Sequence, residues 1–345
     1  MQENLREGWG NLLREEGRIS SWQLGALLGS FLIGTSTIMR PTTQAGRDTW
    51  LAYLFALIAG LAVAWLWFAL TQRLEVPTIQ GIFATLGHYM GAPLALLYLW
   101  YYLYLCALVL RKISELYVTA VMPETPILVF AGVIVLLAAI SVWSGLEVIG
   151  RLAELFFPFI ALAILISHVL ILATPNLVHW EHLTPVLDRG ITPVLRATLS
   201  ILTFPFAETI LFANVLPFTL NRTQSWRMVM SITIFVGLLL MLSATLDSAV
   251  LSIDTVRSSF TTLSMLREVN VGDFLTRVEV VGIFTWTLGG FLKLSLCYWV
   301  LSLGLAEFLG LPDYRSLVFP LGIIMVSLSI LLFESFAAPW SRTTL

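Results

Sequence analysis

A proline, a carboxylate and an amide interrupt one of the most apolar stretches of the sequence. Residues 204–218 read FPFAETILFANVLPF and include Pro205, Glu208 and Asn214. Proline removes a backbone donor and clashes with the preceding helical turn, so it frees carbonyl groups. Inside a bilayer such groups persist only where protein buries them or where they line a polar cavity. The stretch therefore predicts a membrane-spanning helix that is broken near its centre, with its free ends facing a pocket.

A second interruption lies near the start of the chain. Residues 28–41 read LGSFLIGTSTIMRP, and Gly34, Thr35, Ser36 and Thr37 form a small, hydroxylated patch there. Glycine weakens a helix, and hydroxyl groups compete for its backbone hydrogen bonds. Two interrupted spans in corresponding halves of a chain are typical of a midplane binding site between inverted repeats. The alternative is close helix packing, because glycine and proline are also common in ordinary membrane helices.

Aromatic side chains could supply one wall of this site. Tyr98, Tyr101 and Tyr102 share a helical face within the stretch YLWYYLYL, whereas Tyr104 points elsewhere. Aromatic residues near the end of a span usually form interfacial belts. Because these tyrosines extend toward the middle of their span, Tyr98 and Tyr101 are candidates for ligand contact, and the interfacial belt stays open as the alternative.

A lysine lies deep within the eighth predicted span. Lys293 is sixteen residues after Arg277, in the stretch GGFLKLSLCYW. An ammonium group near the middle of a bilayer costs about 3 kcal/mol on insertion scales and normally needs a partner or water. Glu208 is one candidate counter-ion, and the free carbonyls of the first span are the other. Ser295 and Tyr298 lie close in sequence and could add polar contacts.

The composition requires a membrane. Of the 345 residues, 58% are hydrophobic and only 12% are charged, about half the charged fraction of a typical soluble domain. Nine stretches are long and apolar enough to be spans: 21–39, 49–70, 93–117, 126–143, 152–173, 198–219, 227–250, 277–308 and 317–335. Two longer connections, 174–197 and 251–276, are expected to form interfacial helices. Lys and Arg are balanced between the two sides, so charge bias does not predict the orientation.

Several function classes are not expected from this sequence. The net charge of −2 and the absence of a basic cluster give no sign of nucleic-acid binding. Cys106 and Cys297 lie in apolar runs and are expected to act as small hydrophobic residues. No Walker loop, zinc cluster or nucleophile triad is visible, so we expect neither an enzyme nor a cofactor. Residues 1–18 are expected to form an N-terminal interfacial segment, followed by a single transporter-like domain over 19–345.

Five segments in order resemble one known family. They are ISSWQLGALLGSFLIGTSTIMRP, AGRDTWLAYLFA, GLEVIGRLAELFFPF, FPFAETILFANVLPF and RVEVVGIFTWTLGGFLKLSLCYW, which lie between residues 19 and 299, within a resemblance that extends over 19–336. They resemble the B subunits of spore germinant receptors, the spore-permease branch of the amino acid–polyamine–organocation superfamily. The resemblance implies an all-α integral membrane protein with a LeuT-like inverted-repeat helix bundle. It places the break of the sixth helix at Phe206, Ala207, Glu208 and Thr209, beside helix-three and helix-eight walls at Tyr101 and at 293–298.

The resemblance also implies a function. The chain would be the transporter-like subunit of a receptor in the inner membrane of bacterial endospores, in contact with membrane lipid and with the receptor's A and C subunits. It would bind a small nutrient, of the amino acid class, between broken helices one and six and signal germination. A proton- or sodium-coupled secondary amino-acid transporter and a membrane scaffold with a vestigial pocket are the alternatives. The family has ten spans whereas nine are found here, which puts fold stability or partner docking in doubt.

Overall fold

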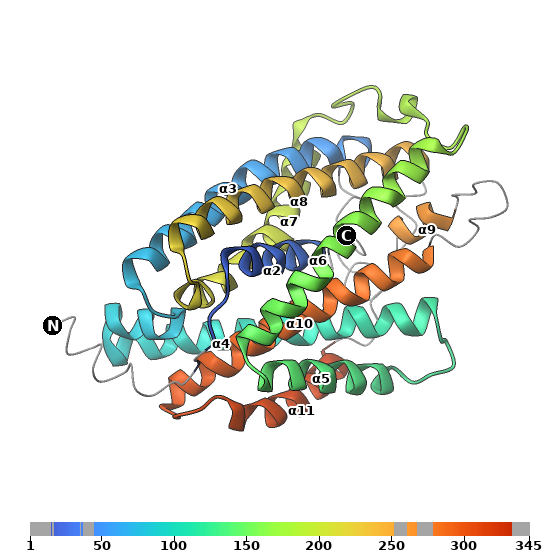
Figure 1. The fold of residues 1–345 in the computed structure, drawn as a ribbon. Coiled ribbons are helices and arrows are strands. Elements are labelled where there is room, and N and C mark those ends of the chain that lie inside the picture. The colour runs from blue at the N-terminus through green and yellow to red at the C-terminus, as the bar shows by residue number, and fades with distance from the viewer. Residues whose placement is uncertain are drawn as a thin grey trace.

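The computed structural model describes residues 15, 17–34, 36, 45–251, 261–267 and 279–332. Every named element in these ranges is helical (Figure 1). The α-helices are α2 (Ser21–Gly34), α3 (Thr49–Leu74), α4 (Thr78–Ala120), α5 (Ile127–Trp143), α6 (Leu146–Ala173), α7 (Ile191–Ile201), α8 (Arg222–Leu251), α9 (Thr261–Arg267), α10 (Glu279–Leu309) and α11 (Arg315–Leu331). Shorter turns are η1 (Gly46–Asp48), η2 (Trp180–Leu183), η3 (Leu202–Phe206), η4 (Ala207–Asn214) and η5 (Leu216–Phe218).

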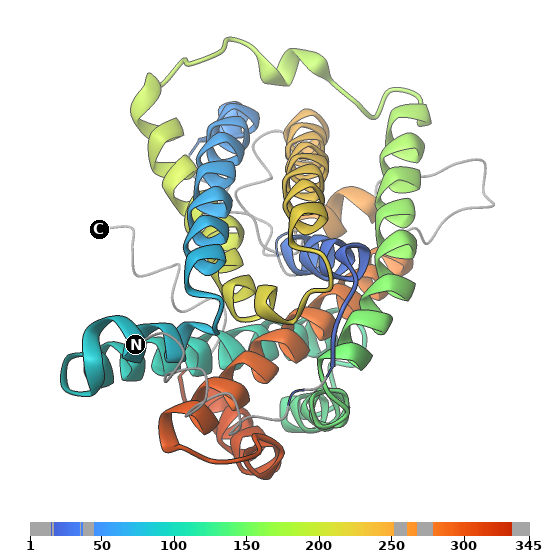
Figure 2. The same ribbon diagram turned by 60° about the vertical axis from the view of Figure 1, so that its left-hand side comes forward.

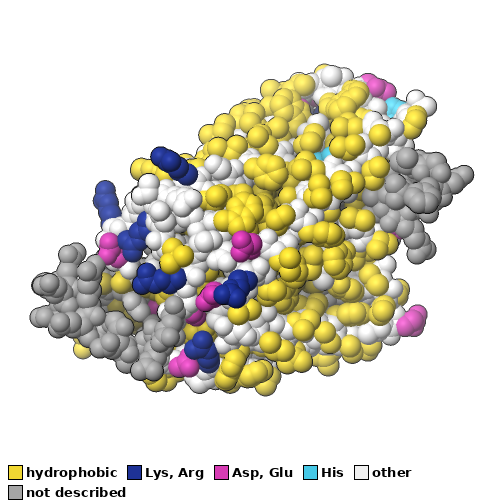
Figure 3. Space-filling model, viewed as in Figure 1, with side chains coloured by type: hydrophobic (Ala, Val, Ile, Leu, Met, Phe, Trp, Pro, Cys, Tyr) yellow, Lys and Arg dark blue, Asp and Glu magenta, His cyan; other side chains and the backbone are white. Residues whose placement is uncertain are grey.

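The outer surface is that of a membrane protein. Six of the described helical segments are long and apolar enough to cross a bilayer, and α2, α5 and α11 are shorter apolar helices. Large apolar side chains such as Leu155, Val169 and Ile323 are more than half exposed. Figure 3 shows apolar side chains over most of one face, with the charged ones gathered toward one end. Because water would penalise such a surface, this face suits lipid.

Helix α2 lies at the centre of the bundle. It packs against α6, α8 and α10, while α3 packs against α7 and α8 (Figures 1 and 2). Helices α4, α5 and α11 form a second group that closes on α10. All residues of α2 from Leu24 to Gly34 are buried, so its surroundings are protein on every side. A buried helix that ends inside the bundle can leave polar backbone groups only where protein satisfies them.

Both predicted breaks are present in the described chain. Helix α2 ends at Gly34, and Ser36 lies in a turn in which its N–H donates to Ile33 O at 3.1 Å. Helix α7 ends at Ile201 and passes into the wide turn η3, where Phe204 has the extended angles φ −136° and ψ 111°. The break thus begins at Phe204, two residues before the start that the family resemblance implies, because Pro205 excludes a helical conformation at the preceding residue.

The two interrupted segments are tied together at one end. The backbone N–H of Ile19 donates to Phe218 O at 3.1 Å, and Leu220 N–H donates to Ile19 O at 3.1 Å. Next to this bridge, Ser21 Oγ donates to Asn221 O at 3.1 Å and lies 3.1 Å from Ser225 Oγ. The start of α2 is therefore hydrogen-bonded to the segment that joins η5 and α8.

The interfacial expectations have mixed outcomes. Within 174–197, the structure shows the turn η2 and the first part of α7 in place of a separate surface helix. Within 251–276, α9 is described, and its Thr262, Met265 and Leu266 line a cavity of about 30 Å³. The interfacial helix expected in residues 1–18 lies almost entirely outside the described residues.

Some charged residues lie deeper than their sequence positions indicate. The third span extends from a kink at Gly87 to Ala120, so Arg111 and Lys112 are buried rather than at its edge. Arg111 instead pairs with Glu115 one turn further along the same helix, Nη2 to Oε1 at 2.9 Å. The side chain of Asp247 on α8 is also fully buried, and Thr262 Oγ1 donates to it at 3.4 Å. Adjacent helices cover these positions, which a single-chain hydropathy pattern does not reveal.

Candidate functional site

The two charges predicted at mid-membrane depth form an ion pair. The Lys293 ammonium on α10 donates to Glu208 Oε2 on η4, and the side chains are 0% and 7% exposed. The prediction that Glu208 is the counter-ion of Lys293 is confirmed. Separating such a pair in a low-dielectric interior is costly, because each ion has lost its hydration shell. The pair therefore holds α10 against the broken segment.

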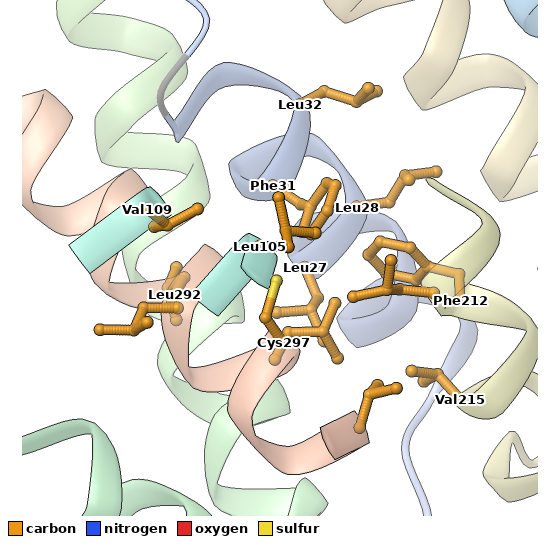
Figure 4. Packing of buried hydrophobic residues seen from close by; sticks show 14 of the residues in the cluster. Leu27, Leu28, Phe31, Leu32, Leu105, Val109, Phe212, Val215, Leu292 and Cys297 are labelled. Carbon is orange, nitrogen blue, oxygen red and sulfur yellow. The ribbon is translucent and has the colours of Figure 1, made fainter. Parts of the chain in front are cut away.

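Aromatic rings surround this ion pair. Lys293 Nζ lies 4.5 Å from the ring centroid of Phe31 on α2 and 4.5 Å from that of Phe204 at the break. A cation over an aromatic face is attracted by the ring quadrupole, more strongly when water is excluded. Phe31 itself meets Phe212 edge-on with centroids 5.4 Å apart, and Figure 4 shows both rings in the apolar cluster beside α10.

A second lysine approaches the same aromatic ring. Lys112 Nζ on α4 lies 3.9 Å from the centroid of Phe204, and Lys112 is 8% exposed. Glu208 and Lys293 are both close enough to act electrostatically on Lys112. We refer to Lys112, Glu208, Lys293 and Phe204 as the charged cluster. It contains two ammonium groups and one carboxylate, contributed by α4, α10 and the broken segment.

The predicted tyrosines lie together on α4. Tyr101 lies within electrostatic range of Glu208 and of Cys297. Tyr98 packs against the ring of Tyr102 at 6.0 Å. Tyr102 is fully buried, and its hydroxyl accepts a hydrogen bond from Asn214 Nδ2 at 3.3 Å. Tyr98 and Tyr101 both pack against the ring of Tyr102, and a direct ligand contact by either stays a prediction.

The Asn214 side chain links α4 to the end of η4. Its Oδ1 accepts from the backbone N–H of Thr78 at 3.1 Å, and its Nδ2 donates to Tyr102. We expect Asn214→Leu to destabilise the protein by about 1–3 kcal/mol, since it leaves a buried donor unpaired. Tyr102→Phe removes one neutral hydrogen bond and should cost about 0.5–1.5 kcal/mol. Denaturant titration of the purified protein in micelles measures both, and equal losses would contradict this ranking.

Other predicted site residues face the scaffold. The buried ring of Phe206 lies against Gly60 on α3. Thr209 Oγ1 accepts from Trp67 Nε1 at 3.2 Å, also on α3. Tyr298 donates its hydroxyl to Val318 O on α11 and is fully buried. Ala207 precedes Glu208 and is half-buried. These positions hold the break in place, and a direct ligand contact by them stays a prediction.

The end of α2 contacts α10 through glycine. A Cβ at Gly34 would lie 2.8 Å from Gly289 O, one helical turn before Lys293. Ser36 closes the helix end, since its Oγ donates to Leu32 O at 2.5 Å and its N–H to Ile33 O at 3.1 Å. The predicted competition of hydroxyls for backbone groups is therefore observed at Ser36. Thr35 and Thr37 lie outside the described residues.

The sequence did not predict three residues that surround the Lys293–Glu208 pair: Phe31, Phe204 and Lys112. Phe31 and Phe204 look like ordinary lipid- or core-facing residues in the sequence. Lys112 follows Arg111 near the end of an apolar run, a position that is typical of a flanking charge. Its position eight residues inside the end of α4 is the signal that could have revealed it. Ser295 is buried near Lys293, and its Oγ has no partner among the described residues.

One known family matches nearly the whole length of this chain. The model of a family described as "Spore germination protein", the spore permeases, matches residues 18–337. The chain belongs to the spore permease family. Spore germination protein KB of Bacillus subtilis (strain 168) is 30% identical over 326 residues, covering 94% of this chain and 87% of that protein. Spore germination protein YndE of the same organism is 24% identical over 302 residues, covering 84% and 81%.

The fold of this spore permease is that of a transporter. A solved structure described as the substrate-bound outward-open state of a Na+-coupled sialic acid symporter aligns with a TM-score of 0.66. The alignment covers 94% of this spore permease and 77% of that chain at 12% identity, so it establishes the fold alone. The expected LeuT-like bundle is confirmed. Family and fold are of the permease type, and the apolar helices make this spore permease an integral membrane protein.

Proposed function

We propose that this spore permease is the nutrient-binding membrane subunit of a germinant receptor. The observation that carries the proposal is the buried pair of Lys293 and Glu208. It lies at the break between α7 and η4, beside the end of α2. A zwitterionic amino acid offers both charges needed to replace this pair, because its carboxylate can meet an ammonium group and its ammonium group can meet Glu208. Burying paired charges avoids the cost that an isolated ion would incur.

Binding is proposed to act by changing the balance between two arrangements of the helices. In the described arrangement the pair joins α10 directly to η4. A ligand inserted between the two charges favours an arrangement in which these elements are further apart. A ligand shifts such a balance only by its difference in affinity for the two states. Receptor A and C subunits in the endospore inner membrane would respond to the new arrangement, as family membership supports.

The proposal is tested by thermal stabilisation of the purified protein. We expect at least one amino acid to raise the melting temperature in a panel of amino acids, sugars and nucleosides, because a ligand that binds only the folded state stabilises it. Glu208→Gln should abolish this shift. Glu147→Gln is the matched control, since Glu147 forms a surface pair with Arg151, Oε1 to Nη2 at 2.5 Å, with both side chains well exposed. A panel without any shift would support the scaffold alternative and contradict nutrient binding.

A coupled transporter is the second candidate, because the matching solved fold is that of a symporter. Reconstitution into proteoliposomes distinguishes the two. Concentrative uptake of the stabilising amino acid, driven by an imposed proton or sodium gradient and without partner subunits, would establish transport. Binding without such uptake is expected for a receptor subunit.

A further inference from the structure

Lys112 is a buried cation that the ion pair of the proposed site does not neutralise. It is 8% exposed, and among the described residues the only carboxylate paired with a lysine of the charged cluster is Glu208, which binds Lys293. The nearest acid on the same helix, Glu115, is engaged by Arg111, with Nε to Oε1 at 3.0 Å and Nη2 to Oε1 at 2.9 Å. The charged cluster therefore has an excess of one positive charge.

The interactions that Lys112 does make are incomplete for an ammonium group. An ammonium has three N–H donors, and the described contact is with the face of Phe204 at 3.9 Å. A cation–π contact contributes about 0.5–2 kcal/mol. That gain is smaller than the several kcal/mol that it costs to remove an ion from water. A carboxylate beside Lys112 would supply acceptors for these donors and pair with its charge.

The surroundings define what kind of anion fits. The ring centroid of Phe204 lies 3.9 Å from Lys112 Nζ and 4.5 Å from Lys293 Nζ, and the backbone of Phe204 is at the break itself. Glu208 lies four residues further along, within electrostatic range of Lys112. An anion that also carries a positive group would meet Lys112 at one end and Glu208 at the other. A free α-amino acid has this arrangement, whereas a sugar or a nucleoside carries neither charge.

We infer that Lys112 is the anchor for the carboxylate of the nutrient. The ammonium group of the nutrient takes the place of Lys293 on Glu208, and the displaced Lys293 shares the carboxylate of the nutrient with Lys112. This inference rests on the proposed nutrient-binding function and specifies its ligand chemistry. The ligand is an α-amino acid with a free carboxylate. Lys112 belongs to α4, outside the two broken segments. A ligand bound to Lys112 and Glu208 would therefore link α4 to η4.

The experiment compares the twenty protein amino acids with their primary amides, which lack the carboxylate charge. Binding is measured by thermal shift and by isothermal titration on the full chain in micelles, for the unaltered protein, Lys112→Met and Lys112→Arg. We expect at least one amino acid to bind, and its amide to bind about 10- to 100-fold more weakly, since a hydrogen bond to a charged group is lost. Lys112→Met should weaken binding of the amino acid by a similar factor and leave the affinity for the amide unchanged. Lys112→Arg should retain most of the affinity.

Each other result is equally informative. If an amino acid binds the Lys112→Met variant as tightly as it binds the unaltered protein, the assignment of Lys112 as the carboxylate anchor is wrong. The proposed nutrient binding is then still supported. If only sugars or nucleosides bind, the assignment of Lys112 as a carboxylate anchor is again wrong. The protein then binds a nutrient, but one of a different class. If nothing binds, both fail. We expect ligand-free Lys112→Met to be at least as stable as the unaltered protein, because it removes an uncompensated buried charge. If neither Lys112→Met nor Lys112→Gln folds, the charge is structural and the inference is overturned.

Discussion

Glu208→Gln is expected to destabilise the ligand-free protein by about 3–5 kcal/mol, because the change leaves buried ammonium groups without their carboxylate. In the described structure Glu208 pairs with Lys293 and acts on Lys112. The substitution raises the net charge of the charged cluster from one to two positive charges. Its effect should therefore exceed that of Lys293→Met, after which Lys112 and Glu208 still balance each other. Denaturant titration in micelles gives the free energies of unfolding.

The double variant Glu208→Gln/Lys293→Met separates charge from packing. It restores the original net charge of the charged cluster, so its stability should lie between those of the two single variants. The surface pair of Arg151 and Glu147, with side chains 69% and 44% exposed, provides the comparison. Glu147→Gln should cost less than about 1 kcal/mol, since water screens exposed pairs. If Glu208→Gln is as mild as Glu147→Gln, the buried pair does not hold α10 to the break.

Gly289→Ala is expected to destabilise the protein by about 1–3 kcal/mol through overpacking, even though alanine favours a helix. A Cβ at this position would lie 2.9 Å from Gly34 Cα, so two backbones would have to separate. Side-chain rotation cannot relieve that contact. The displacement would also move Lys293, one turn further along α10. We therefore expect weaker amino-acid binding together with a lower melting temperature.

Gly132→Ala is the matched control for this prediction. Gly132 also lies within a membrane helix, α5, but a Cβ there would meet nothing within 4 Å. The change should leave stability unaltered or raise it by up to about 1 kcal/mol, which is the difference in helix propensity. If Gly289→Ala behaves like Gly132→Ala, the close approach of α2 and α10 does not constrain the site.

Much of the architecture follows from hydropathy and from the positions of glycine and proline. Long apolar runs predict helices because a bilayer offers no partner for backbone groups, and all nine predicted spans correspond to described helical segments. The break at Pro205 follows from the missing N–H of proline. The extent of α4 was less predictable, since Arg111 and Lys112 resemble flanking charges until neighbouring helices are known to cover them.

The site was partly predictable for the same reason. A lone lysine in the middle of a span demands a partner, and Glu208 was one of two groups able to supply it. Which side chain faces which helix depends on rotation and packing, which a sequence pattern leaves open. Tyr298 illustrates this point, because it lies near Lys293 in sequence while its hydroxyl contacts α11. Phe204 and Lys112 became recognisable only when α4 and the break were seen to meet.

The backbone bridge at Ile19 restricts how the two interrupted segments can move. Its hydrogen bonds join the beginning of α2 to Phe218 and Leu220, beyond the broken part of the sixth helix. Movement of either segment at this end must either break these bonds or carry the other segment with it. A movement at the break would then shift both chain segments together. A protein docked at this end would meet one displaced surface rather than two independent ones.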